Sequence, residues 1–84
     1  MSKLEKEIER LKSKPKDFTY EELKYLLIKL GFYEYNKGKT SGSSVKFVDN
    51  YERKIELHKP HPNNIVKTYK ILDIIEKLTE WRLI

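Results

Sequence analysis

Apolar residues recur along the chain first at helical spacing, then in alternation with polar residues, and again at helical spacing near the end. The first segment places Leu4, Ile8 and Leu11 among charged residues, which predicts an amphipathic helix over residues 3–13. Pro15 ends this pattern because proline cannot continue a helix. The single narrow apolar stripe indicates a short helix that lies on the domain and is not enclosed by it.

The second helical segment, DFTYEELKYLLIKLG, carries start and stop signals as well as an apolar face. Thr19 and Glu22 have the spacing of a capping box, in which each side chain accepts a hydrogen bond from the other residue's backbone N–H. Phe18 and Leu23 occupy the positions of a hydrophobic staple across the helix start. Gly31 follows the last apolar residue and can adopt the positive φ that ends many helices. The apolar face consists of Leu23, Leu26, Leu27 and Leu30.

Three segments then alternate in the manner of strands: FYEYNK, SSVKFVD and RKIELH. The last two place on one side Val45, Phe47, Ile55 and Leu57. If that side faces a single core, a three-residue loop, Asn50–Glu52, joins the two strands as an antiparallel pair. In this register Ser44 lies opposite His58, and Lys46 lies opposite Glu56.

A proline-rich loop, KPHPNN, leads to the last helical segment, TYKILDIIEKLTEW, with Thr68 as its expected N-cap. Its apolar face consists of Ile71, Ile74, Ile75 and Leu78, and the apolar surface continues through Trp81, Leu83 and Ile84. The order helix, helix, three strands, helix predicts the α+β class, with helices on one face of a three-stranded antiparallel sheet. We expect residues 1–16 to form a short N-terminal helix and residues 17–84 to form the main domain.

Composition narrows the class of protein. The length of 84 residues corresponds to one small domain, and the absence of cysteine excludes disulfides and cysteine metal sites. No apolar run approaches the ~18 residues that a membrane span needs, and no signal-peptide region is present. We therefore expect a cytoplasmic protein that does not contact a membrane.

The net charge of +5 is concentrated in the middle of the chain. Residues 36–70 contain eight Lys or Arg against three Asp or Glu, whereas the segments before and after are close to neutral. A localised basic patch indicates a polyanionic partner, most simply nucleic acid. An ordinary solvated, lysine-rich surface would have the same composition.

Two interpretations of the stretch GKTSGSS fail on its spacing. A phosphate-binding loop needs four residues between its first glycine and the Gly-Lys pair, followed by a helix. Here six residues separate Gly31 from Gly38, and a strand follows. Ser43 and Ser44 lack the glycine pattern around a hydrolase nucleophile, and serines in glycine-rich loops usually form turns.

The two histidines, His58 and His61, have the spacing of a metal-binding pair. Pro60 lies between them and no third ligand is evident, so we expect no metal site. Histidine is the side chain that changes protonation near neutral pH, which makes both residues candidates for proton transfer.

The polar side of the predicted sheet gathers cations around one histidine. Its expected members are Ser44, Lys46, Lys54 and His58, with Lys37, Lys39 and Lys59 at the edges. RNA cleavage without a metal needs a base for the 2′-hydroxyl proton, a cation beside the phosphorane and an acid for the leaving oxygen. This face has such groups, although an ordinary solvated sheet face has the same pattern.

Taken in order, FTYEELKYLLIKLGF, KGKTSGSSVKF, HKPHPNN and a final amphipathic helix make the chain resemble the HicA toxins over roughly residues 17–80. The resemblance implies a double-stranded-RNA-binding-domain-like fold and an mRNA interferase, which is an endoribonuclease of type II toxin–antitoxin systems. It also implies two partners, RNA and a HicB-like antitoxin protein that covers the basic sheet face.

Most HicA toxins carry Gly-Ser-His at the start of the second strand, and that histidine is catalytic. The chain has GSS at residues 42–44, and a serine is not a general base near neutral pH without an activator. The resemblance therefore leaves proton transfer to His58, beside Ser44 in the expected register, or to His61 in the following loop. Lys46 would stabilise the phosphorane.

These observations predict a HicA-like toxin that binds and cleaves mRNA without a metal or a small-molecule cofactor. The sites expected to bind RNA are Lys37, Lys39, Lys46, Lys54 and Lys59. Because the usual histidine is absent, the alternative is a catalytically silent RNA-binding or protein-interaction module of the same fold.

Overall fold

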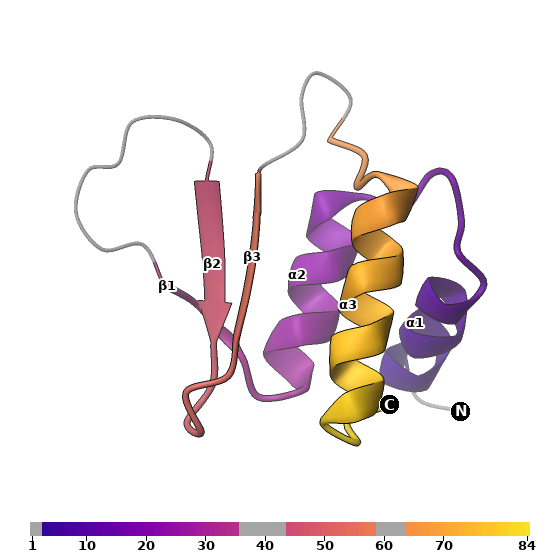
Figure 1. Cartoon of the computed structure of the whole chain (residues 1–84). Helices are drawn as coiled ribbons and strands as arrows, with labels where there is room; N and C mark the ends of the chain where they lie inside the picture. Colours follow the sequence, from indigo (N-terminus) through magenta and orange to yellow (C-terminus); the bar gives the residue numbers. More distant parts are fainter. Residues whose placement is uncertain (1–2, 36–43, 59–63) are drawn as a thin grey trace.

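The computed structural model describes residues 3–35, 44–58 and 64–84. Its elements are α1 (Lys3–Lys12), α2 (Tyr20–Lys29), β1 (Tyr33–Tyr35), β2 (Ser44–Val48), β3 (Lys54–His58) and α3 (Thr68–Glu80). This order confirms the predicted α+β class (Figure 1). In the described part of the chain, no helix combines the length and apolar character needed to cross a membrane.

The three strands form one antiparallel sheet in the order β1-β2-β3, and helices cover only one of its faces. Helices α2 and α3 lie side by side against the sheet, and α1 packs on these two helices from the side away from the sheet (Figure 1). Among the described residues, no helix lies on the opposite face of the sheet.

The predicted register of β2 and β3 is confirmed. Ser44 pairs with His58 and Lys46 with Glu56, joined by the loop Asn50–Glu52. The Asp49 N–H donates to the Arg53 carbonyl at 3.1 Å and closes that loop. Because strand side chains alternate, this pairing settles which residues of β2 and β3 point to the helices and which point away.

The start of α2 has the predicted capping box. The Thr19 hydroxyl accepts from the Glu22 N–H at 3.1 Å, and the Glu22 carboxylate accepts from the Thr19 N–H at 2.9 Å. The same carboxylate accepts from Arg10 Nε of α1 at 2.7 Å, so the box also ties α1 to α2. At the other end, Gly31 has a φ of +104°, as its position after the helix predicts.

The start of α3 differs from the prediction. Thr68 is the first helical residue and not the N-cap, and the capping position belongs to Lys67, which makes no side-chain cap. The preceding chain is held extended because the Val66 N–H donates to the Phe18 carbonyl at 2.8 Å and Ile65 bridges Thr19. This tertiary contact allows the helix to begin one residue earlier than its side-chain pattern indicates.

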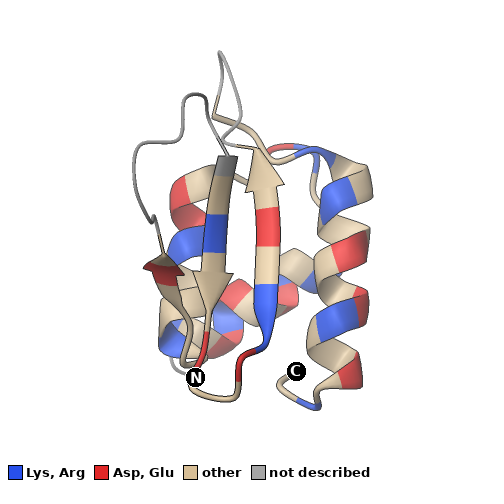
Figure 2. Cartoon of the chain, turned by 60° about the vertical axis from the view of Figure 1, so that its left-hand side comes forward, with Lys and Arg blue, Asp and Glu red and all other residues tan. Residues whose placement is uncertain are grey.

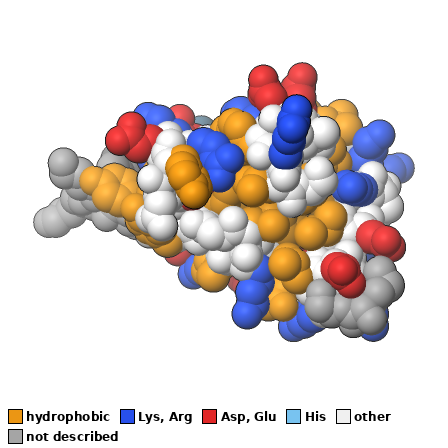
Figure 3. Space-filling view, turned by 90° about the horizontal axis from the view of Figure 1, so that it is seen from below, with side chains coloured by type: hydrophobic (Ala, Val, Ile, Leu, Met, Phe, Trp, Pro, Cys, Tyr) orange, Lys and Arg blue, Asp and Glu red, His pale blue; other side chains and the backbone are white. Residues whose placement is uncertain are grey.

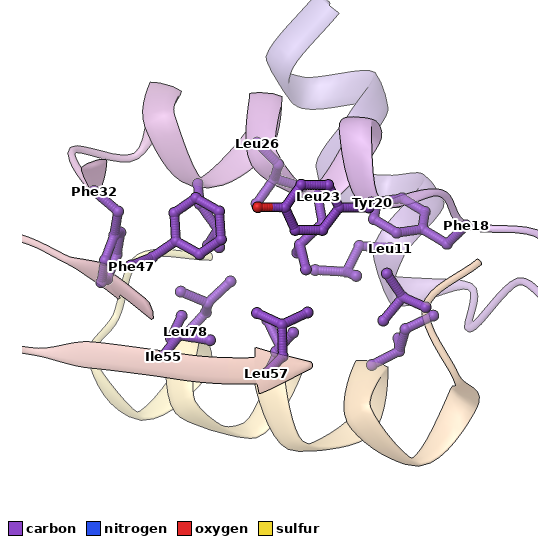
Figure 4. Packing of buried hydrophobic residues seen from close by; sticks show 14 of the residues in the cluster. Leu11, Phe18, Tyr20, Leu23, Leu26, Phe32, Phe47, Ile55, Leu57 and Leu78 are labelled. Atoms are coloured by element: carbon purple, nitrogen blue, oxygen red, sulfur yellow. The ribbon is translucent and has the colours of Figure 1, made fainter. Parts of the chain in front are cut away.

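The core lies between the sheet and the α2–α3 pair (Figure 4). Phe47, Ile55 and Leu57 point from the strands toward the helices. Leu11 of α1 is 0% exposed and belongs to the same cluster, so α1 is part of the packed domain. Each such aliphatic side chain contributes about 1.5–3 kcal/mol relative to exposure.

The last residues of the chain also pack on this core. Trp81, Leu83 and Ile84 are half-buried against it, and the rings of Trp81 and Phe32 lie 5.9 Å apart between centroids. Seen from below, hydrophobic side chains gather at the end of the molecule where the C-terminus lies (Figure 3). The apolar terminal residues thus belong to the fold.

Candidate nucleic-acid interface

Charged residues lie along all three strands (Figure 2), and strand pairing decides which of them share the outer face of the sheet with exposed aromatic side chains. Along β3 the residues alternate between exposed and buried, and Lys54, Glu56 and His58 are the exposed ones. In β2 the buried residues are Val45 and Phe47, which leaves Lys46 on the outer face. Of the described residues, two lysines, one glutamate and His58 therefore lie on the outer face.

Strand pairing orders these side chains in rows across the sheet. One row runs Tyr35, Lys46, Glu56 and the next runs Tyr33, Val48, Lys54. Ser44 and His58 pair in a further row, two residues along from the first. Successive rows on one face lie about 7 Å apart because each residue of a strand advances about 3.4 Å. The histidine thus stands at one end of a strip of tyrosines and lysines.

Lys46 is the most connected cation of this face. Its ammonium lies 3.5 Å from a carboxylate oxygen of Glu56 and 6.0 Å from the centroid of the Tyr35 ring. The Glu56 side chain is 64% exposed, and an exposed ion pair of this kind contributes at most about 1 kcal/mol. The Lys46–Glu56 pair therefore adds little to the stability of the fold.

A shallow hollow of about 360 Å³ opens between the side chains of the two rows. It is lined by Tyr33, Tyr35, Lys46, Val48, Asp49, Glu52 and Lys54. Two lysines and two carboxylates line it, and the carboxylates belong to the loop Asn50–Glu52 or lie next to it. Of these, Asp49 is only 6% exposed, whereas Glu52 is exposed.

The Asp49 carboxylate is hydrogen-bonded within the turn. Its carboxylate accepts from the Tyr51 N–H at 3.0 Å, the Arg53 N–H at 2.9 Å and the Arg53 Nε at 2.6 Å. Burial raises the pKa of this carboxyl, but the hydrogen bonds and the charge of Arg53 outweigh burial and hold the pKa below its ordinary value. Asp49 is thus an ionised structural group whose charge is balanced by Arg53.

The expected site residues fall into two groups. His58, Lys46 and Lys54 lie on the same outer face, with the backbone of Ser44 directly across from His58, but Lys54 is four residues, or about 14 Å, along β3 from His58. Four expected residues lie outside the described part of the chain: Lys37, Lys39, Lys59 and His61. Within the described ranges, no three His, Asp or Glu side chains are grouped to bind a metal ion.

The sequence-based selection of site residues omitted the aromatic part of this face. Tyr33 and Tyr35 are 50% and 40% exposed and stand beside Lys46 and Lys54. Their alternate positions in FYEYNK place them on the same face of a strand. Only the pairing of β1 with β2 shows which face this is.

Comparison with known proteins gives one finding. The family model described as the HicA toxin of bacterial toxin–antitoxin systems matches residues 20–79. The matched segment runs from the start of α2 to the last turn of α3 and includes all three strands, while α1 lies outside it. No curated protein and no solved structure matches the chain.

Proposed function

Because the chain belongs to the family of HicA toxins of bacterial toxin–antitoxin systems, we propose that it binds and cleaves mRNA in the cytoplasm as an endoribonuclease that uses no metal. Members of this family are in general mRNA-cleaving toxins. We also propose that a HicB-like antitoxin neutralises the chain by covering the outer sheet face. Residues 17–84 are the toxin domain in this proposal, and residues 1–16 are an N-terminal addition.

The observation that carries the enzymatic part is the position of His58. His58 is exposed on the outer face and pairs across the strands with Ser44. Ser44 is the residue that corresponds to the histidine of the resembling toxins. A histidine on β3 can reach the space over this pair from the opposite strand. His61, in the loop after β3, is the second candidate.

The proposed reaction is an internal transfer of the RNA phosphate. A base removes the 2′-hydroxyl proton, the 2′-oxygen forms a bond to phosphorus, and the bond from phosphorus to the 5′-oxygen breaks. An acid gives a proton to the departing 5′-oxygen, which leaves a 2′,3′-cyclic phosphate. Lys46 stabilises the negative charge of the phosphorane. The remaining cations, Lys37, Lys39, Lys54 and Lys59, bind neighbouring phosphates.

The test is growth arrest on induced expression, together with incubation of end-labelled RNA with the purified protein. We expect the intact chain to cut RNA and His58→Ala to lose cutting while it retains binding to a 2′-O-methyl oligonucleotide, which has no 2′-hydroxyl to deprotonate. His61→Ala is the matched histidine variant, and Ser44→Ala asks whether the serine hydroxyl takes part.

Ser44→His is the sharpest companion variant, because it restores the Gly-Ser-His pattern of the resembling toxins. If the intact chain binds RNA but neither cuts it nor arrests growth, and Ser44→His gains both activities, the natural chain is a silent binding module. Cutting by every histidine and serine variant at the rate of the intact chain would contradict the assignment of His58 and His61.

A further inference from the structure

We propose that the hollow on the outer sheet face is a base-binding subsite, which selects single-stranded RNA by stacking an unpaired base on Tyr33 or Tyr35. The proposal rests on the proposed RNA-cleaving function and adds the class of RNA that the site accepts. It is carried by the two exposed rings, the hollow beside them and the lysines that line it.

The two rings form an aromatic platform. Tyr33 and Tyr35 are alternate residues of β1, so their side chains leave the same face of the sheet about 7 Å apart. They are 50% and 40% exposed, and the Lys46 ammonium stands 6.0 Å from the Tyr35 ring centroid, at the outer limit of a cation–π contact. Both rings are therefore partly exposed to solvent, and any base can stack on an exposed ring because each base has a π-face.

The charges around the hollow fit a nucleotide better than an uncharged ligand. Lys54 makes no ion pair with any other described residue, and Lys46 holds only the exposed Glu56. Asp49 is buried and bound to Arg53, which leaves Glu52 as the exposed carboxylate of the lining. The half-buried Val48 lies between the lysines and the tyrosines. The hollow therefore provides an apolar surface for a base and cations for the phosphates of its nucleotide.

The geometry favours an unpaired base over a duplex. Bases of a duplex are stacked on one another, and their faces are not accessible to a side chain of a sheet. RNA-binding sheets that carry exposed aromatic residues bind splayed single strands, whereas duplex RNA is recognised by its grooves and phosphates. An open, flat face with two rings in alternate positions belongs to the first kind.

The subsite also has a defined place relative to His58. The row that contains Tyr35 lies about 7 Å from the row of His58, and the row that contains Tyr33 lies about 14 Å from it. A base in the hollow therefore belongs to a nucleotide close to the cleaved bond but not to the reacting phosphate. The base would position the strand, and His58 would act on a neighbouring linkage.

Binding of a fluorescent 2′-O-methyl single strand, measured by anisotropy, tests the subsite without cleavage. We expect Tyr33→Ala and Tyr35→Ala each to weaken binding by about 5- to 100-fold, the loss found when a base-stacking ring is removed. Tyr33→Phe and Tyr35→Phe keep the ring and should stay within about twofold of the intact protein. Tyr69→Ala is the matched control, because Tyr69 is 70% exposed on α3 and outside the hollow.

A second measurement reports stacking itself. An oligonucleotide with 2-aminopurine at successive positions should lose fluorescence on binding at one or two positions, and the loss should disappear in the alanine variants. Circular dichroism of each variant shows whether the fold is retained. If an alanine variant does not fold, the phenylalanine variants still test the proposal. A phenylalanine ring also stacks on a base, so loss of 2-aminopurine fluorescence in these variants supports the subsite.

Different outcomes separate the two proposals. Salt-sensitive binding of single strands that is unchanged in both alanine variants overturns the base-binding subsite and leaves the proposed function standing. Tighter binding of a duplex of the same sequence than of the single strand also overturns the subsite. An intact protein that binds neither form of RNA overturns both proposals.

Discussion

Asp49 and Arg53 connect the hairpin turn to the end of the chain. The guanidinium of Arg53 lies 5.0 Å from the centroid of the Tyr51 ring and 5.4 Å from that of Trp81, and it pairs with the buried carboxylate of Asp49. This arrangement holds the loop Asn50–Glu52 against α3 and the C-terminal residues. The turn that sets the register of the outer face is therefore stabilised by tertiary contacts as well as by its own hydrogen bonds.

We expect Asp49→Asn to lower the free energy of unfolding by about 1–3 kcal/mol, because Arg53 and two backbone N–H groups lose a charged acceptor in a buried position. Urea denaturation followed by tryptophan fluorescence measures this loss. Glu52→Gln is the matched control, because it removes a carboxylate from an exposed position of the same turn and should leave the midpoint nearly unchanged. Equal losses in the two variants would contradict the role of Asp49.

Acid should destabilise the fold through the same carboxylate. The pKa of Asp49 is lowered, so the unfolded chain binds its proton more readily than the folded chain does. The stabilisation is present above the ordinary value of about 4 and is lost as the pH falls through the folded value below it. We expect the thermal midpoint to fall between pH 5 and pH 2 and to fall less in Asp49→Asn. An identical pH profile in the two proteins would refute this contribution.

At the scale of elements, α1 lies outside the family match yet reaches the core. Its Leu11 is fully buried, and its Arg10 pairs with Glu22 at the capping box of α2. The guanidinium hydrogen bond lowers the pKa of Glu22, which burial alone would raise. Helix α1 is thus joined to the rest of the fold by both apolar and ionic contacts.

If α1 is part of the cooperative fold, Leu11→Ala should lower the free energy of unfolding by about 2–5 kcal/mol, the cost of a cavity at a buried leucine. Chemical denaturation of the whole chain gives this value, and Lys12→Ala, at the next and exposed position of the same helix, serves as the control. A Leu11→Ala variant as stable as the intact chain would show that residues 1–16 are only loosely attached.

The two helix starts provide a matched pair of threonines. Thr19→Ala removes the capping box of α2 and should cost about 1 kcal/mol. Thr68→Ala alters a residue that makes no cap and is exposed, so its effect should stay within about 0.5 kcal/mol. Both values come from denaturation midpoints. A larger loss at Thr68 than at Thr19 would contradict the assignment of Lys67 as the N-cap of α3.

At the scale of the whole molecule, function depends on a division between two faces. One face of the sheet is buried under α2 and α3, and the other presents lysines, tyrosines and His58 to solvent. Helix α1 lies on the far side of the helical layer (Figure 1). A polyanion that binds the outer face should therefore not contact the charges of α1.

This division predicts which lysines affect the salt dependence of RNA binding. Lys54→Ala should reduce the slope of log affinity against log salt by about 1, because one phosphate contact and its counterion release are lost. Lys12→Ala, on α1, should leave the slope unchanged. Binding titrations at several salt concentrations measure both slopes, and a larger change for Lys12→Ala would place the RNA on the helical side.

The sequence alone determined the features that depend on neighbouring residues. The capping box of α2, the stop at Gly31 and the register of β2 with β3 follow from short-range spacing and from the parity of a three-residue loop. The candidate His58 followed from the same register. The capping box and the helix stop were predictable because their interactions lie within a few residues of one another, and the register was predictable because a short loop and one buried face restrict the pairing.

Only the tertiary structure decided the orientation of β1 and the place of α1. In β1 it is Glu34 that lies on the inner side, opposite Phe47. It is stabilised there because the Tyr20 hydroxyl donates to it at 3.0 Å and the Lys24 ammonium lies 3.0 Å away. A half-buried carboxylate is tolerated when distant residues compensate it. Partners supplied by α2 thus turned the tyrosines outward and created the hollow, which no local pattern in the sequence indicates.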